Sequence, residues 1–288
     1  MTAPLHHDDR SDGAGAPQPF FLAGAAGPLF CLQLAPAPGV TPRGALLYLP
    51  PFAEEANRSR RMAVLQARRL AARGWPVLLL DPFGTGDSAG AFHEARWELW
   101  LADAARAATW LATRWPGGSV TLWGLRLGAL LAAALAAREP GRFTRLLFWQ
   151  PLLRGDRFMA RFLRLRVAAT MAAGEKGSGQ VLRARLAAGE ILEVAGYELA
   201  PDLVAAIEGL RLEALLAPLE GCTIDWLELA AAGSEPALAP ASRRLLDAQP
   251  AAGGPRLTSQ AVAGEPFWTI QEITLAPRLL DATDALFA

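Results

Sequence analysis

Cysteine, histidine and net charge are all scarce in this chain of 288 residues. The two cysteines, Cys31 and Cys222, are too few for a disulfide framework and lack metal-ligand spacing, which suits a reducing compartment. Lysine plus arginine equals aspartate plus glutamate at 28 each, and no nucleic-acid-binding signature appears. We therefore expect no metal, no cofactor and no nucleic-acid partner.

Long apolar runs and the pattern of a secretory leader are also lacking. The strongly apolar run from Leu127 to Ala137 is shorter than the ~20 residues that a spanning helix needs. Residues 1–19 carry proline, glycine and acidic residues without the basic-then-apolar order of a signal peptide, so we expect a disordered tail there. These features favour a cytoplasmic protein.

Hydrophobic residues are abundant at 52%, enough for one large core. Short apolar runs alternate with amphipathic segments, which predicts a mainly parallel α/β sheet flanked by helices on both faces. Eight strands are predicted, at residues 20–22, 29–34, 44–50, 75–80, 119–123, 143–149, 222–229 and 256–262. The main helices between and after them are predicted at residues 57–73, 97–115, 129–138 and 242–249.

The alternation stops after Pro151, where several helices and no buried strand are expected until residue 222. We interpret residues 152–218 as a helical cap inserted into the α/β core. The core itself is then formed by residues 20–151 and 219–288.

The segment Gly124-Leu125-Arg126-Leu127-Gly128 lies between a predicted strand and a predicted helix, as a G-x-S-x-G nucleophile elbow does. Its two glycines leave room for the sharp turn. An arginine, however, stands where the nucleophile belongs. Its guanidinium stays protonated, so it can neither attack a carbonyl nor act as a base.

The other members of a Ser-His-Asp triad are also doubtful. The histidines are His6, His7 and His93, so none follows the last predicted strand, where the segment reads Gly264-Glu265-Pro266-Phe267-Trp268. For the acid, Glu235 in an Asp-Pro-like turn and Glu228 are candidates, although either is as well explained by an arginine partner or by solvent. Loss of serine or histidine alone costs on the order of 10⁶ in rate, so ordinary ester hydrolysis is not expected. Ser59, Ser88 or Asp87 could replace the nucleophile only beside an activating base.

The order of elements, the elbow and the turn at residues 81–88 resemble the α/β-hydrolase superfamily over roughly residues 20–288. Five segments resemble, more narrowly, the hydrolases associated with exosortase A: residues 50–55, 57–62, 124–128, 195–197 and 264–268. This resemblance implies an α/β-hydrolase fold, a hydrolase of ester type if active, and a setting in PEP-CTERM protein export and exopolysaccharide production in Gram-negative bacteria. It also implies envelope-export proteins as partners.

An arginine at the elbow adds positive charge to a helix N-terminus whose amides already favour anions. Arg126 could bind a carboxylate, phosphate or sulfate, or it could be neutralised internally by Glu54, Glu55 or Asp81. The residues expected to form the oxyanion and ligand site are Phe52, Ala53, Glu54, Glu55, Leu127, Gln150 and Trp268.

Four arginines of the predicted cap, at spacings of three, four and three, fall on one helical face: Arg154, Arg157, Arg161 and Arg164. They form either a solvated or internally paired surface, or a contact for anionic lipid headgroups or an acidic polymer.

Two hypotheses follow from the sequence. One is an enzyme with an unusual route, in which Arg126 polarises or clamps the substrate and a carboxylate such as Glu235 acts as acid or base. The other, which the missing triad favours, is a non-catalytic binding or scaffolding protein. It would use the cleft to bind an anion or another ligand, or the basic cap to engage an envelope-export partner.

Overall fold

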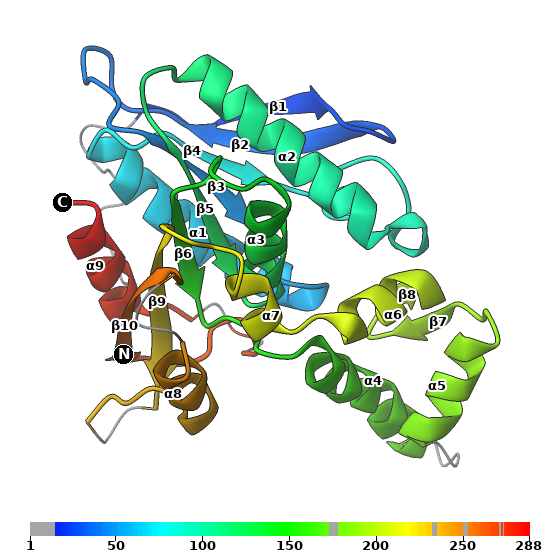
Figure 1. The fold of residues 1–288 in the computed structure, drawn as a ribbon. Coiled ribbons are helices and arrows are strands. Elements are labelled where there is room, and N and C mark those ends of the chain that lie inside the picture. Colours follow the sequence, from blue (N-terminus) through cyan, green and yellow to red (C-terminus); the bar gives the residue numbers. More distant parts are fainter. Residues whose placement is uncertain (1–14, 173–177, 232–234, 250–252, 271, 273) are drawn as a thin grey trace, which may run out of the picture.

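The computed structural model describes residues 15–172, 178–231, 235–249, 253–270, 272 and 274–288, and contains one eight-stranded sheet with the order β1-β2-β4-β3-β5-β6-β9-β10 (Figure 1). Its strands are β1 (Gln18–Ala23), β2 (Pro28–Leu34), β3 (Ala45–Leu49), β4 (Val77–Leu80), β5 (Val120–Leu125), β6 (Arg145–Trp149), β9 (Thr223–Ala230) and β10 (Arg256–Ala263). The pairings β1–β2 and β2–β4 are antiparallel, whereas every other pair is parallel. This sheet confirms the predicted α/β-hydrolase fold.

Helices cover both faces of the sheet because its central strands are apolar on both sides. On one face lie α1 (Glu54–Ala72) and α9 (Pro277–Leu286), which pack against each other. On the other lie α2 (Trp97–Arg114) and α3 (Leu127–Arg138). Alternate residues of β3, such as Leu46 and Leu47, therefore belong to two separate buried clusters. Two shorter helices, η1 (Phe92–Glu94) and α8 (Pro240–Asp247), follow β4 and β9 in the chain.

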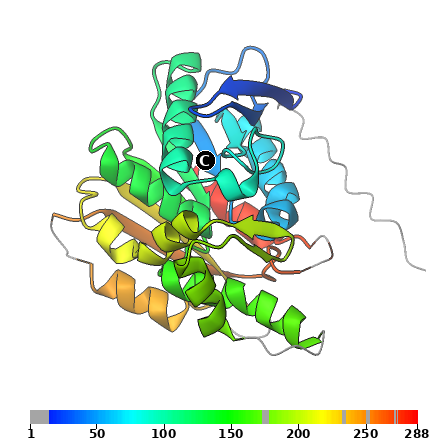
Figure 2. The ribbon, with the colours of Figure 1, turned by 90° about the vertical axis from the view of Figure 1, so that its right-hand side faces the viewer.

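Between β6 and β9 the chain forms α4 (Gly155–Ala172), α5 (Gly179–Ala187), α6 (Pro201–Gly209) and α7 (Leu212–Leu216), and Figure 2 turns this part toward the viewer. The expectation of no buried strand here was wrong. A hairpin of β7 (Leu192–Val194) and β8 (Tyr197–Leu199) lies between α5 and α6, and Leu192, Val194 and Leu199 are buried. Ala195 and Gly196 take φ of 51° and 84°, the left-handed pair that a tight hairpin turn requires.

The N-terminal expectation needs a smaller correction. Most of the predicted disordered tail, residues 1–14, lies outside the described residues. Its last two residues, Gln18 and Pro19, already belong to β1 and pair with Gln33 and Leu32. Within the described ranges, no helix has the length and apolar character needed to cross a membrane.

The elbow glycines are required by close packing between β3, β5 and α3. A Cβ on Gly128 would lie 2.0 Å from the Leu49 carbonyl oxygen, and one on Gly124 would lie 2.4 Å from the Ala129 nitrogen. Both distances are far below van der Waals contact, so only glycine fits. These contacts fix the position of residue 126 at the carboxyl edge of the sheet.

Candidate functional site

Arg126 occupies the apex of a strained strand-to-helix turn. Its φ of 57° and ψ of −114° lie in a region that non-glycine residues rarely adopt, at a cost of about 1–3 kcal/mol. The turn is joined to the end of β6 by a hydrogen bond of 3.0 Å from the Arg126 N–H to the Trp149 carbonyl oxygen. The backbone of an active-site elbow is thus present, with an arginine side chain at its apex.

The Arg126 side chain is neutralised by Glu55. Its Nε donates to Glu55 Oε2 at 3.3 Å and its Nη2 to Glu55 Oε1 at 3.1 Å. The two side chains are only 12% and 11% exposed. Of the three partners considered from sequence, Glu55 is therefore the one that the structure selects.

A tryptophan covers the other side of the arginine. The Trp268 ring centroid lies 5.3 Å from the Arg126 guanidinium carbon, within the range of a cation–π contact. Trp268 is buried and belongs to the segment after β10, where a triad histidine would stand. The elbow residue and a residue of the segment after β10 thus contact each other directly.

Burial and charge act in opposite directions on Glu55. Burial raises the pKa of its carboxyl, while the positive charge and hydrogen bonds of Arg126 lower it. Burial has the larger effect, so the pKa is raised. The ionised form of Glu55 is therefore stabilised mainly by the positive charge and hydrogen bonds of Arg126.

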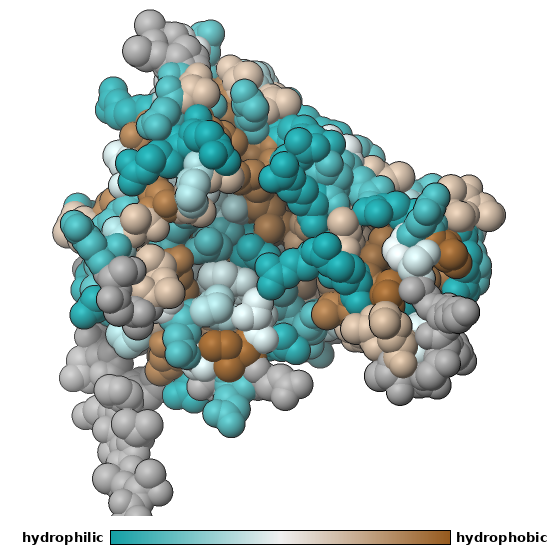
Figure 3. Space-filling model, turned by 90° about the horizontal axis from the view of Figure 1, so that it is seen from below, coloured by the Kyte–Doolittle hydropathy of each residue, from teal (hydrophilic) through white to brown (hydrophobic). Residues whose placement is uncertain are grey.

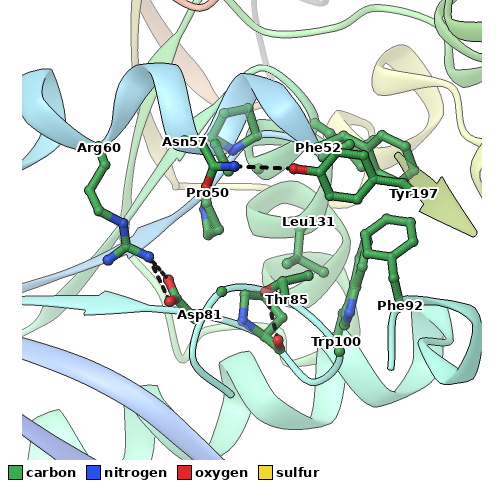
Figure 4. A pocket seen from close by; sticks show the side chains of 18 of the residues that line it. Pro50, Phe52, Asn57, Arg60, Asp81, Thr85, Phe92, Trp100, Leu131 and Tyr197 are labelled. Carbon is green, nitrogen blue, oxygen red and sulfur yellow. Dashed lines mark hydrogen bonds and ion pairs between the residues drawn. The ribbon is translucent and has the colours of Figure 1, made fainter. Parts of the chain in front are cut away.

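A cleft of about 410 Å³ lies beside this pair, at the carboxyl ends of β3, β4 and β5 (Figure 4). Ala53, which precedes α1, has φ 54° and ψ −130°, close to the values of Arg126. Ala53 and Leu127, which we expect from the sequence to belong to the oxyanion site, both line the cleft. Leu127 is the first residue of α3, so its N–H has no partner one helical turn earlier.

The cleft walls are aromatic and partly polar. Phe52, Phe92 and Trp100 form one wall, and Phe92 packs edge-on against Tyr197 at 5.0 Å. Asn57 Nδ2 donates to the Tyr197 hydroxyl at 3.2 Å, which joins α1 to the hairpin of the inserted segment (Figure 4).

An ion pair forms the opposite side of the cleft. Arg60 Nη2 lies 2.5 Å and 2.6 Å from the two carboxylate oxygens of Asp81 (Figure 4). Asp81 is thus engaged by Arg60 and not by Arg126.

Several residues predicted for the site have other roles. Gln150 does not line the cleft, because its Oε1 accepts a hydrogen bond of 2.8 Å from the Leu229 N–H. Glu235 is exposed to solvent. Glu228 is buried and accepts hydrogen bonds from Trp226 Nε1 and the Ala239 N–H, both at 2.9 Å. Glu54 is half-buried, and its Oε2 has no hydrogen-bond partner among the described residues.

Ser59 and Ser88, considered from sequence as substitute nucleophiles, donate their hydroxyl hydrogen bonds to the backbone. Ser59 Oγ donates to the Glu55 carbonyl oxygen at 2.6 Å, and Ser88 Oγ donates to the Asp81 carbonyl oxygen at 2.5 Å. His93 Nδ1 lies 2.7 Å from Glu198 Oε2 in an exposed contact between η1 and β8. Neither serine has a histidine as its hydrogen-bond partner in the described part of the chain.

A second cavity, of about 690 Å³, lies on the other side of Arg126. Three of the four predicted cap arginines line it: Arg154, Arg157 and Arg161. Arg164 is exposed and does not line it.

Sequence reasoning missed Asn57 and Arg60 of the cleft, and Arg211 and Arg244 of the second cavity. Asn57 and Arg60 lie three and six residues after Glu54, on the turns of α1 that face the cleft, so helical spacing from the true helix start could have indicated them. Arg211 and Arg244 in the second cavity come from elements far apart in sequence, and no local pattern marks them.

Residues 41–185 match the family described as serine aminopeptidase, S33. The chain belongs to this family of α/β hydrolases. A comparison with curated proteins finds no match for the sequence.

Three solved structures illustrate the shared fold. Est1E from Butyrivibrio proteoclasticus, with ferulic acid bound, is 14% identical with a TM-score of 0.66, covering 93% of this chain and 97% of its own. The serine hydrolase XC6422 from Xanthomonas campestris is 16% identical with a TM-score of 0.54, covering 94% and 91%. The thioesterase domain of the curacin biosynthetic pathway is 15% identical with a TM-score of 0.56, covering 95% and 99%.

Proposed function

We propose that this member of the family binds a small ligand in its hydrolase cleft and does not hydrolyse it. The observation that carries the proposal is the Arg126–Glu55 pair. The side chain at the nucleophile position is a buried cation held at two atoms by a carboxylate, and Trp268 packs on it in place of a base. Without a nucleophile or a base the attack on a carbonyl cannot begin.

The cleft supports a ligand with a carboxylate or carbonyl oxygen at one end and an apolar or aromatic body. The oxygen would accept hydrogen bonds from the Ala53 and Leu127 N–H groups, at the start of two helices whose dipoles favour negative charge. The body would pack against Phe52, Phe92 and Trp100. Ferulic acid, seen on Est1E, is a ligand of this chemical kind.

Ferulate and other aryl carboxylates are the probes that test this proposal. We expect saturable binding by calorimetry, and loss of it in Ala56→Trp, which places a large ring in the cleft. Arg61→Trp is the matched control, because it adds the same ring to an exposed position of α1 that does not line the cleft. Equal binding by both variants, or no saturable binding of any aryl or alkyl carboxylate, would contradict the proposal.

The cellular setting is a further part of the proposal. We place the protein in the cytoplasm of a Gram-negative bacterium, in the exosortase A and exopolysaccharide export setting. Support comes from the five segments that carry the resemblance, since four of them contribute residues to the cleft and the fifth contributes Trp268. Deletion of the gene should impair export of PEP-CTERM proteins or exopolysaccharide, and unchanged export of both would contradict this setting.

A further inference from the structure

The second cavity is formed where α4, α7 and α8 meet the elbow. Its apolar lining includes Leu152 and Phe158, which are buried, and Leu245, which is half-buried. Phe158 also packs edge-on against Phe52 of the cleft, with ring centroids 5.6 Å apart. The two aromatic rings therefore stand between the cavity and the cleft, and the two hollows are distinct.

Six arginines line this cavity against a single acidic residue, Glu213: Arg126, Arg154, Arg157, Arg161, Arg211 and Arg244. Three of the six have carboxylate partners. Arg126 is held by Glu55, while Arg154 and Arg211 share Asp156, with Nη2–Oδ2 distances of 2.7 Å and 3.2 Å. Even with Glu55, Asp156 and Glu213 counted against the six arginines, an excess of three positive charges surrounds the cavity.

Three of the six arginines, Arg157, Arg161 and Arg244, have no carboxylate partner at ion-pair distance among the described residues. In the described ranges, no hydrogen bond or ion pair joins any of these side chains to another residue, although the charge of Arg161 also acts on Glu55 and lowers the pKa of that carboxyl. Arg157 and Arg161 come from α4 and Arg244 comes from α8, and all three are exposed. Figure 3 looks onto the side of the molecule where α4 and α8 lie in Figure 1, and hydrophilic surface predominates there with apolar patches between.

A basic surface that only faces solvent would not need arginines from two helices to line the same cavity. Like charges repel, and arginines on separate helices lower that repulsion when they point apart into solvent. Here they converge on one hollow whose volume of about 690 Å³ is in the range that holds small molecules. An anion between α4 and α8 would be attracted by the excess of positive charge around the cavity.

We propose that this cavity is a second binding site, for a small molecule that carries two or more phosphate groups. Phosphate matches the planar fork of arginine, which donates two parallel hydrogen bonds to it. Two linked phosphates would offer one anionic group to the arginines of α4 and another to Arg244 of α8. The apolar lining from Leu152, Phe158 and Leu245 would contact the organic part of such a molecule.

Calorimetric titration of the full chain with inorganic pyrophosphate tests this site. Pyrophosphate should bind about ten-fold more tightly than inorganic monophosphate, because two linked groups engage two arginine sets. Arg157→Ala, Arg161→Ala and Arg244→Ala should each weaken pyrophosphate binding about five-fold to ten-fold. Glu213→Gln should strengthen it, since it removes the acidic side chain that lines the cavity.

The matched controls are Arg164→Ala on α4 and Arg243→Ala on α8, which are exposed and do not line the cavity. They should leave pyrophosphate affinity within about two-fold of the parent. Equal losses in control and cavity variants would show nonspecific attraction and overturn the proposal. Citrate binding as tightly as pyrophosphate would overturn the assignment to phosphate.

The proposal for this site and the proposal for the ligand cleft can be tested independently, because the two hollows share no lining residue. Ala56→Trp should abolish carboxylate binding in the cleft and leave pyrophosphate binding intact, whereas Arg157→Ala should weaken pyrophosphate binding about five-fold to ten-fold and leave carboxylate binding intact.

Discussion

At the scale of single residues, the pair Arg126–Glu55 decides how the site works. A serine at an elbow is exposed to its substrate, whereas here a bidentate ion pair is nine-tenths buried and covered by a tryptophan. In the function that we propose, this pair gives the elbow position a structural role. It leaves the neighbouring amides available to a ligand.

Glu55→Ala should therefore destabilise the fold by about 3–5 kcal/mol, because it leaves the Arg126 charge buried without a partner. The double variant Glu55→Leu with Arg126→Met should lose much less, since no buried charge remains. Chemical denaturation of the single and double variants measures both effects. Glu98→Ala, which breaks an exposed pair with Arg138, is the control and should cost no more than about 1 kcal/mol. A Glu55→Ala loss as small as that control would mean that the buried pair is not formed.

The two cysteines give a second prediction. Burial raises the pKa of the Cys31 thiol to about 12 and that of the Cys222 thiol to about 11. A raised thiol pKa means that the unreactive protonated form persists at pH 8. An aromatic disulfide reagent should therefore label neither cysteine in the native protein and both after unfolding in denaturant. Rapid native labelling of either thiol at pH 8 would contradict the structure.

At the scale of elements, hydrophobic periodicity was sufficient to predict the eight-stranded sheet, because each buried strand is a short apolar run. The β7–β8 hairpin was not predicted from the sequence, because strands of three residues are too short to show an alternation of apolar and polar residues. The internal partner of Arg126 could not be chosen from sequence. We predicted a helix start at residue 57, but α1 begins at Glu54, and its true register directs Glu55 toward the elbow.

Glycine packing at the elbow gives a prediction for this junction of β3, β5 and α3. Gly128→Ala should destabilise the protein by at least about 3 kcal/mol or prevent folding, because its Cβ would collide with the Leu49 carbonyl oxygen. Gly209→Ala is the control, at the end of α6 with no atom within 4 Å of the added Cβ. It should be neutral or stabilising by up to about 1 kcal/mol. Thermal unfolding of both variants measures the difference, and equal stability would show that the elbow is not closely packed.

At the scale of the whole molecule, the chain has the sheet of the hydrolase fold, the backbone of the elbow and a cleft at the carboxyl edge of the sheet. Two hollows flank the elbow, one aromatic and partly polar, the other bordered by arginines. The sequence indicated the aromatic hollow, because the motifs that follow strands β3 and β5 supply much of its lining. The second could not be predicted, because only the folded chain brings Arg211 and Arg244 next to the arginines of α4.

Restoring a serine at the elbow should not restore an enzyme. Arg126→Ser supplies a hydroxyl, yet no histidine follows β10 to take its proton, and Glu55 would lose its partner. We expect no esterase activity from this variant in a stopped assay with p-nitrophenyl esters. Activity well above the parent would show that another residue acts as the base.

The central claim, that the cleft binds without catalysis, is tested most directly by turnover of the parent protein. Purified protein is incubated with a panel of ester, thioester, amide and glycosidic substrates, and product is quantified by mass spectrometry. The account predicts no product above the buffer rate for any substrate, because loss of a triad serine or histidine alone costs on the order of 10⁶ in rate. Multiple turnovers that disappear in Arg126→Ala would contradict it.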